Sequence, residues 1–185
     1  SLRQTLLDAR TLLAVLQKES PQPVGVAGLS LGGALAEVLT CLEPGFAFSA
    51  PFIAHMDLGA LVADAPVLGA MREDLLRFGW TPRDFGAFTK RLGWDELRPV
   101  IPPARICLFA ARDDHFFRAS VVRAMWRRWQ KPRIHWYPAS HMGFLVHLPD
   151  AVGRLRSFVD GLELTAPSGR PRSQRAKPSR PRRRG

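Results

Sequence analysis

The sequence predicts an α/β protein with a mainly parallel β-sheet flanked by helices. Short apolar segments without polar alternation, typical of buried parallel strands, alternate along the chain with longer segments of helical periodicity. A Gly-x-Ser-x-Gly sequence also stands where the first apolar segment gives way to a helical pattern. The length of 185 residues is typical of one domain, since domains span roughly 100–200 residues.

The first part of the chain is predicted to form a helix, a strand, a second helix and a second strand. Leucines at helical spacing over residues 2–16 predict a helix of about four to five turns, which ends at a Ser-Pro-Gln-Pro sequence. Three elements follow it: a buried strand at residues 24–28, a helix at residues 31–42 and a second strand at residues 46–50.

Residues 51–103 interrupt this alternation and are interpreted as an insertion over one end of the sheet. Helical pieces are expected at about 57–63, at about 68–78 and after Thr81-Pro82, where Thr81 is a plausible N-cap. We expect the large apolar residues of the insertion to be the packed faces of its helices, with an apolar lid for an acyl chain as the alternative. They are Phe52, Met56, Met71, Phe78, Trp80, Phe85, Phe88 and Trp94.

The alternation resumes after the insertion. Residues 105–111 predict a third strand, residues 121–129 a helix, residues 133–137 a fourth strand and residues 151–162 a final helix. Helices that connect parallel strands give right-handed crossovers, and such sheets bind ligands at the carboxyl ends of their strands. The candidate functional residues are therefore those that directly follow each strand.

The net charge of +11 belongs mainly to a tail. Residues 166–185 hold eight basic residues and no acidic residue, whereas the other 165 residues carry a net charge of only +3. We expect residues 163–185 to be a disordered Arg/Pro-rich extension beyond a domain at 1–162. The tail is interpreted as a solubilising extension, with weak, non-specific binding to polyanions as the alternative; no specific nucleic-acid partner is expected.

Other features bear on the compartment. The two cysteines, Cys41 and Cys107, lie in helical and strand patterns and are expected to be buried, although a disulfide between them stays open. No apolar run reaches the roughly 18–20 residues of a membrane span. The chain opens at Ser1 inside a helical pattern, without a signal-peptide sequence. We expect a cytoplasmic protein, and a chain that is a piece of a longer one.

The turn after the first strand carries the candidate nucleophile. In Gly28-Leu29-Ser30-Leu31-Gly32, the hydroxyl of Ser30 would be exposed above the sheet by a strained turn, and a Cβ at Gly28 or Gly32 is expected to clash. The backbone N–H of Leu31, at the start of the following helix, would stabilise an oxyanion. The alternative is a structural Gly-Ser turn without chemistry.

The ends of the third and fourth strands carry a candidate acid and base. Asp114, with Asp113 as the alternative, follows the third strand, and His141 follows the fourth. A carboxylate there can orient an imidazole, and the chain order Ser, Asp, His fits this kind of sheet. The two acids could instead be a solvated pair or a helix cap. The other histidines do not follow a strand in this way, and no spacing typical of a metal site supports a metal ion. They are His55, His115, His135 and His147.

Three segments together resemble the α/β-hydrolase superfamily: GLSLGG, AARDD and WYPASHMGF. The resemblance covers roughly residues 1–162, and the segment from Trp126 to His141 is similar to a poorly characterised bacterial branch. It implies that Ser30, Asp114 and His141 are nucleophile, acid and base, that Leu31 is an oxyanion donor, and that the insertion is the variable cap.

The sequence also departs from that family. Only the later half of its usual sheet of about eight strands is recognisable, so the loop that supplies a second oxyanion donor is absent. The strand at residues 24–28 would then have an open edge. Ala111 and Arg118 stand where family members often have Gly and Pro, which weakens the choice between Asp113 and Asp114.

The resemblance implies a serine hydrolase that acts on an ester-like acyl bond, with an apolar acyl or aryl ester favoured by the aromatic insertion. No cofactor and no metal are expected, and the partner would be a small-molecule substrate. The alternative from another class is a non-catalytic or truncated hydrolase remnant that acts as a scaffold and is inactive without the missing N-terminal strands.

Overall fold

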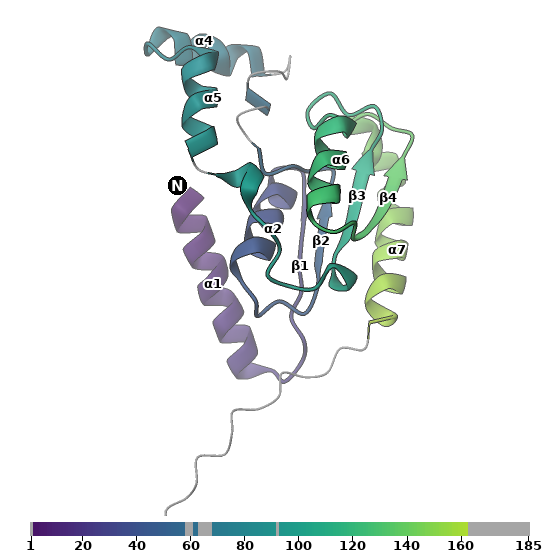
Figure 1. The fold of residues 1–185 in the computed structure, drawn as a ribbon. Helices are drawn as coiled ribbons and strands as arrows, with labels where there is room; N and C mark the ends of the chain where they lie inside the picture. The colour runs from purple at the N-terminus through teal and green to yellow at the C-terminus, as the bar shows by residue number, and fades with distance from the viewer. Residues whose placement is uncertain (1, 58–60, 63–67, 92, 163–185) are drawn as a thin grey trace, which may run out of the picture.

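A computed structural model describes residues 2–57, 61–62, 68–91 and 93–162 of the chain. Figure 1 shows its elements as a twisted sheet with helices on both faces. The α-helices are α1 (Leu2–Glu19), α2 (Leu31–Leu42), α4 (Gly69–Arg77), α5 (Pro82–Arg91), α6 (Ala119–Arg128) and α7 (Leu148–Asp160). The strands are β1 (Val26–Leu29), β2 (Ser49–Phe52), β3 (Cys107–Ala111) and β4 (Arg133–Tyr137). The short 3-10 helices are η2 (Trp94–Glu96), η3 (Pro103–Arg105) and η4 (Met142–His147).

The four strands form one parallel sheet in the order β1-β2-β3-β4. Because all strands run in the same direction, all four carboxyl ends lie at one edge of the sheet. The predicted α/β class with a mainly parallel sheet is therefore confirmed. β1 is an edge strand of the described sheet, as the sequence suggested.

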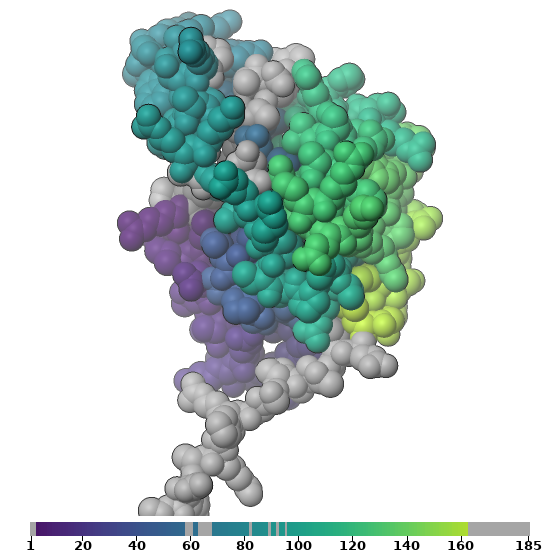
Figure 2. Space-filling view, viewed as in Figure 1, coloured from purple at the N-terminus to yellow at the C-terminus, as the bar shows by residue number. Residues whose placement is uncertain are grey.

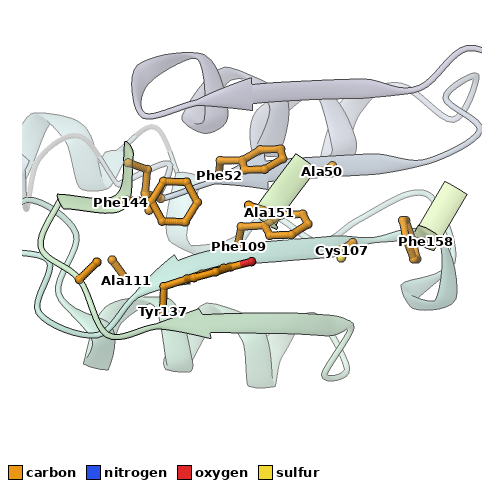
Figure 3. Close-up of a cluster of buried hydrophobic side chains, with 11 residues drawn as sticks. Ala50, Phe52, Cys107, Phe109, Ala111, Tyr137, Phe144, Ala151 and Phe158 are labelled. Atoms are coloured by element: carbon orange, nitrogen blue, oxygen red, sulfur yellow. The ribbon is translucent and has the colours of Figure 1, made fainter. Parts of the chain in front are cut away.

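Each face of the sheet packs on helices through its own hydrophobic cluster. On one face, α7 covers a cluster in which the rings of Phe52 and Phe109 stack with centroids 4.3 Å apart, and Figure 3 shows Phe144 and Tyr137 beside them. On the other face, α2 and α6 cover a second cluster, in which Trp129 is 1% exposed. The alternation of side chains along β3 supplies both clusters.

The predicted elements that fall within the described residues are present, with shifted bounds in three of the four strands. β2 begins at Ser49 rather than at residue 46. The preceding residues form a loop, in which Phe46 packs in a third cluster with Leu13 and Leu39 and the Ala47 N–H donates to the carbonyl of Val24. β1 likewise begins later than predicted, at Val26, and β3 begins at Cys107 rather than at residue 105. Most of the helix expected at about 57–63 lies outside the described residues.

The segment between β2 and β3 differs from the expected packing. The N-cap at Thr81 is confirmed, because its Oγ1 accepts the Asp84 N–H while the Asp84 carboxylate accepts the Thr81 N–H. Phe52 and Met56 are buried, and Phe52 belongs to β2. The interpretation as packed faces is wrong for four other apolar residues, which are exposed because α4 and α5 stand clear of the sheet (Figure 1). They are Met71, Phe78, Trp80 and Phe88.

Both cysteines are buried, free thiols, so the disulfide that the sequence left open is not formed. Burial raises the pKa of Cys41 and of Cys107 to about 12, which keeps both unreactive at neutral pH. Among the described residues, no helix combines the length and the apolar character needed to cross a bilayer.

We predict that Phe109→Ala lowers the free energy of unfolding by about 3–5 kcal/mol, because it leaves a cavity beside Phe52 at the centre of the sheet. The same truncation at Phe78, which is 82% exposed, should change the free energy by less than about 0.5 kcal/mol. Urea unfolding of both variants measures the difference. Equal losses would contradict the core described above.

Candidate active site

Ser30 lies in a strained turn between β1 and α2. Its backbone has φ 54° and ψ −116°, a positive φ that residues other than glycine rarely adopt. Two hydrogen bonds hold it there: its N–H donates to the carbonyl of Phe52 at 3.0 Å, and its own carbonyl accepts the N–H of Ala34 at 2.9 Å. The turn places the hydroxyl at the carboxyl edge of the sheet.

The glycines around Ser30 have unequal roles. A Cβ on Gly28 would lie 2.1 Å from the carbonyl oxygen of Gly32, so the clash expected at Gly28 is present. A Cβ on Gly32 would meet nothing within 4 Å, so the clash expected there is absent. The crowded position is instead Gly33, whose Cβ would lie 2.6 Å from the Cβ of Ala54. The Gly-Gly pair in the sequence was the signal that could have pointed to it.

A chain of two hydrogen bonds joins three side chains that are far apart in the sequence. Ser30 Oγ lies 2.9 Å from His141 Nε2, and His141 Nδ1 lies 2.8 Å from Asp114 Oδ2. The three residues follow β1, β4 and β3, so the parallel sheet brings them to one edge. The imidazole and the carboxylate are both buried, which shields their contact from water.

The turn after β3 distinguishes the two candidate acids. Asp114 is buried, and its second oxygen, Oδ1, accepts the backbone N–H groups of Phe116 at 2.7 Å and Phe117 at 3.0 Å. Asp113 is exposed, and its backbone N–H bonds the carbonyl of Ala139. Neither acid caps α6, whose N-cap residue is Arg118. The geometry thus favours Asp114 as the partner of the imidazole.

Aromatic rings orient His141, and sequence reasoning missed them. The ring of Phe116 stacks on the imidazole with centroids 4.4 Å apart and an interplanar angle of 29°. Phe117 packs at 5.8 Å from the same imidazole. Because the two phenylalanines also donate their N–H groups to Asp114, one short turn fixes both the acid and the base. An aromatic pair directly after a candidate acid is the signal that could have found them.

Among the described residues, the other histidines take no part in this hydrogen-bonded chain, although His55 shares a pocket with Phe116 and Phe117. The buried His55 accepts the N–H of Asp57 at its Nδ1, and the ring of His135 stacks on Phe109 in the sheet. Within the part of the chain that the structure describes, no three His, Cys, Asp or Glu side chains are grouped so that they could hold a metal ion.

The start of α2 provides N–H groups next to Ser30. The first intrahelical bond of α2 runs from Ala34 to Ser30, so the N–H of Leu31 precedes the bonded part of the helix. The Leu31 side chain is 59% exposed at this edge, and Met142 and Val146 of η4 are exposed after His141. Exposed apolar side chains therefore adjoin Ser30 and His141 in the sequence, and the first turn of α2 offers backbone donors beside Ser30.

Glu37 is a buried acid on the helix that carries the serine. It lies two turns after Ser30, is 1% exposed, and accepts a hydrogen bond from the backbone N–H of Met56. Its Oε2 has no hydrogen-bond partner among the described residues. Burial raises the pKa of this carboxyl well above its usual value, although the Met56 N–H offsets part of the rise. Glu37 therefore fastens the segment after β2 to α2 through the Met56 N–H, and its burial favours the protonated form of the acid.

The comparisons with solved structures define the class of fold. The Pyrococcus furiosus esterase Pf2001 matches with a TM-score of 0.59 and 17% identity, over 84% of this chain and 61% of that chain. The enol-lactonase from Burkholderia xenovorans LB400 matches with a TM-score of 0.55 and 12% identity, over 86% of this chain and 73% of that chain. Pyrococcus horikoshii acylaminoacyl peptidase gives a TM-score of 0.61 and 12% identity, over 91% of this chain and 28% of that chain. The chain has the α/β-hydrolase fold.

Relatives by sequence come from Mycobacterium tuberculosis. An uncharacterized protein found in two strains of that organism is 31% identical over 180 residues, which cover 93% of this chain. The chain spans about 40% of the length of these curated relatives. A comparison with known protein families finds no match to the chain.

We predict that Gly33→Ala destabilises the protein by roughly 1–3 kcal/mol, because the new Cβ overlaps Ala54 and cannot be accommodated without backbone movement. Gly32→Ala should be neutral or stabilise by up to about 1 kcal/mol, since its site is open and helical. Thermal unfolding of the two neighbouring variants provides the comparison. A larger loss for Gly32→Ala would refute the assignment of the crowded position.

We predict that Glu37→Gln removes a pH dependence of stability. The unfolded chain ionises Glu37 near its ordinary pKa, whereas the folded protein keeps it protonated to a higher pH. The stabilising contribution of Glu37 is therefore complete at acidic pH and is lost as the pH rises toward the folded pKa. The variant should gain stability relative to the wild type as the pH rises above about 5, as measured by urea midpoints.

The exposed Glu73 of α4 supplies the control, because Glu73→Gln should leave the pH profile of the wild type unchanged. If Glu37→Gln and the wild type keep a constant stability difference across the pH range, Glu37 is not a neutral acid in the folded protein.

Proposed function

We propose that this chain carries the catalytic centre of a serine hydrolase that acts on ester-like acyl bonds. The observation that supports the proposal is the hydrogen-bonded chain from Ser30 through His141 to Asp114 at the carboxyl edge of the sheet. Nucleophile, base and orienting acid within hydrogen-bond reach are the arrangement that activates a hydroxyl for acyl transfer. The esterase and the enol-lactonase that share the fold support the same class of reaction.

The first half of the reaction forms an acyl-enzyme. His141 Nε2 takes the proton of the Ser30 hydroxyl as Oγ attacks the carbonyl carbon of the ester. The oxyanion that develops is stabilised by the N–H of Leu31 and by the N-terminal end of the α2 dipole. His141 then gives its proton to the departing alkoxide, so the alcohol leaves neutral. Asp114 stabilises the transient imidazolium through its 2.8 Å contact with Nδ1.

The second half regenerates the enzyme. Water attacks the acyl-serine while His141 accepts its proton, and the carboxylic acid leaves as Ser30 Oγ recovers a proton. The stacked ring of Phe116 keeps the imidazole in one orientation through both halves. No step of this sequence requires a cofactor.

An apolar acyl or aryl group fits the surroundings of the hydroxyl. Exposed apolar side chains follow two of the three residues in the sequence: Leu31 comes directly after Ser30, and Met142 and Val146 come after His141. A substrate that covers them would remove apolar surface from water, at about 25 cal/mol per Å². The proposal therefore specifies a small-molecule ester with an apolar acyl or aryl part.

We predict that a fluorophosphonate probe labels Ser30 and that the chain hydrolyses a p-nitrophenyl ester. Ser30→Ala should abolish labelling, because no other described serine contacts a buried imidazole. Asp114→Asn should lower the hydrolysis rate by about 10,000-fold, since the amide holds the imidazole in the wrong tautomer. Mass spectrometry of the labelled peptide and steady-state kinetics measure these effects.

Two matched variants serve as controls. Asp113→Asn, at the exposed neighbouring acid, should leave the rate within about threefold of the wild type, and Ser120→Ala on α6 should leave labelling intact. Absence of labelling at Ser30 in the wild type would refute the proposal and favour a non-catalytic scaffold.

A further inference from the structure

The imidazole of His141 lies on a segment without a long regular element. We call residues 138–147 the histidine loop: it follows β4, whose last residue is Tyr137, and it ends with η4 just before α7. The imidazole bonds Ser30 and Asp114, which follow two other strands. Its distance from the Ser30 hydroxyl therefore depends on what holds this loop against the rest of the domain.

Backbone hydrogen bonds tie the start of the histidine loop to the turn after β3. The Arg112 N–H donates to the Tyr137 carbonyl at 2.9 Å. The Asp113 N–H donates to the Ala139 carbonyl at 3.1 Å. Both carbonyls stand before His141 in the sequence, so these bonds fix the point at which the chain leaves the sheet but not the path that follows the imidazole.

After His141, the histidine loop turns back on itself. The Gly143 N–H donates to the Ser140 hydroxyl at 3.1 Å, and the Phe144 N–H donates to the Ser140 carbonyl at 3.0 Å. Hydrogen bonds over so short a stretch of chain shape a turn without attaching it to the sheet. The second half of the loop is attached through side chains, and Tyr137 is at the centre of these contacts.

The Tyr137 hydroxyl closes the histidine loop. It donates a 2.7 Å hydrogen bond to Oδ2 of Asp150, which stands in the first turn of α7. The same oxygen accepts a 2.7 Å hydrogen bond from Nε of Arg154, one turn further along α7. The end of β4 is thus joined to the start of α7 across the segment that carries His141.

The Tyr137 ring supports the turn that follows the imidazole. It packs edge-on against Phe144 of η4, with centroids 5.2 Å apart and an interplanar angle of 90°, and it lies 5.3 Å from the ring of His147. Figure 3 shows the rings of Tyr137 and Phe144 in the hydrophobic cluster that α7 covers. Because Phe144 is fully buried, a tyrosine held by Asp150 keeps this turn against the core.

Both partners of the Tyr137–Asp150 bond keep the required form at neutral pH. Burial raises the pKa of Tyr137 to about 12, so its hydroxyl remains a donor. Hydrogen bonds from Arg154 and Tyr137 lower the pKa of Asp150, so the acceptor is ionised. A hydrogen bond to an ionised acceptor is shorter and stronger than one between neutral groups.

The bond runs from the core to the surface. α7 is an outer element of the molecule, and Figure 2 shows its yellow-green atoms at the surface. The Asp150 side chain is 52% exposed, whereas Tyr137 is 6% exposed. Asp150 can therefore be replaced without leaving a cavity in the core, which separates the loss of the bond from the loss of packing.

We propose that Tyr137 is a positioning residue for His141. Its bond to Asp150 holds the histidine loop in the form that keeps the imidazole Nε2 within reach of the serine hydroxyl. The inference rests on the proposed function and deepens it. Proton transfer depends so strongly on placement that a displacement of about 1 Å can lower the rate roughly 100-fold. Tyr137 thus acts on the rate through the imidazole rather than through the substrate.

The alternative is that the bond only stabilises α7. A carboxylate in the first turn of a helix is stabilising by itself, because it faces the positive end of the helix dipole. Loss of the bond would then lower the stability of the protein and leave the rate of the folded molecules unchanged. The two roles therefore differ in kcat per active site, with active sites counted by fluorophosphonate labelling.

The test is the steady-state hydrolysis of a p-nitrophenyl ester by the full chain and its variants. Tyr137→Phe removes the hydroxyl and keeps the ring, so it should lower kcat about 10- to 100-fold while KM changes less than about twofold. Asp150→Ala should give the same loss, whereas Asp150→Asn, whose amide oxygen still accepts, should stay within about threefold of the wild type. The double variant Tyr137→Phe/Asp150→Ala should lose no more than either single variant, because both remove one bond.

Asp160→Ala is the matched control, because it removes an exposed carboxylate that pairs with an arginine of the same helix at the same spacing. It should leave kcat within about twofold of the wild type. Urea unfolding verifies that each variant is folded under the assay conditions. An equal loss in Asp160→Ala, or an unchanged kcat in Tyr137→Phe, would overturn the proposal.

Amide hydrogen exchange reports on the histidine loop independently of activity. The N–H groups of Gly143 and Phe144 should exchange at least about tenfold faster in Tyr137→Phe than in the wild type. Unchanged exchange would refute the proposal, because the bond would then not hold the loop. If the wild type neither hydrolyses the ester nor reacts with the fluorophosphonate, the proposed function fails, whereas the exchange result still decides whether Tyr137 holds the loop that carries the imidazole.

Discussion

The contact between Asp114 and His141 is the interaction on which the candidate site depends. It joins the end of β3 to the end of β4, and it places the imidazole within 2.9 Å of a serine that belongs to a third strand. The carboxylate can do this because its other oxygen is already held by two backbone N–H groups of the turn that follows β3. The sheet supplies the proximity, and the turn supplies the orientation.

The carboxyl edge of the sheet holds two of the four described non-glycine residues that have a positive φ. Ser30 has a positive φ, and so does Ile53, the β-branched residue that follows β2. Such conformations cost roughly 1–3 kcal/mol each and persist only where the surroundings determine them. Here, hydrogen bonds from Ser30 and Ile53 to the carbonyls of the neighbouring strands extend the sheet past its last residues. The buried Glu37 adds a further constraint, because it ties the segment beyond Ile53 to the helix that begins at Ser30.

Much of the fold could be predicted because hydrophobic periodicity records burial directly. The helix at residues 31–42 and the strand at residues 133–137 agree with the structure in both bounds. Ser30, Asp114 and His141 could be proposed because the carboxyl ends of parallel strands must meet. For Phe116 the sequence offers only its place in an aromatic pair directly after the acid, since stacking on the imidazole depends on a loop path that has no period. Gly33 was missed for a similar reason: the Gly-Gly pair marks two positions without a Cβ, but only the long-range approach of Ala54 shows which of them is crowded. The exposure of Phe78 differs from the expected packing, because this residue caps the C-terminus of α4 with its ring in solvent.

The two ends of the sheet differ in charge, and part of the difference follows from the direction in which the helices run. α2 points its positive N-terminus at Ser30, and α6 places its negative C-terminus at the opposite end. Compensation of that C-terminus accounts for Arg127 and Arg128, because cations in the last turn stabilise a helix by roughly 0.3–1 kcal/mol each. It does not account for Lys131 and Arg133, which follow the helix, or for Arg105, which belongs to another element. The charge of these three residues therefore has no counterpart in the dipole of α6.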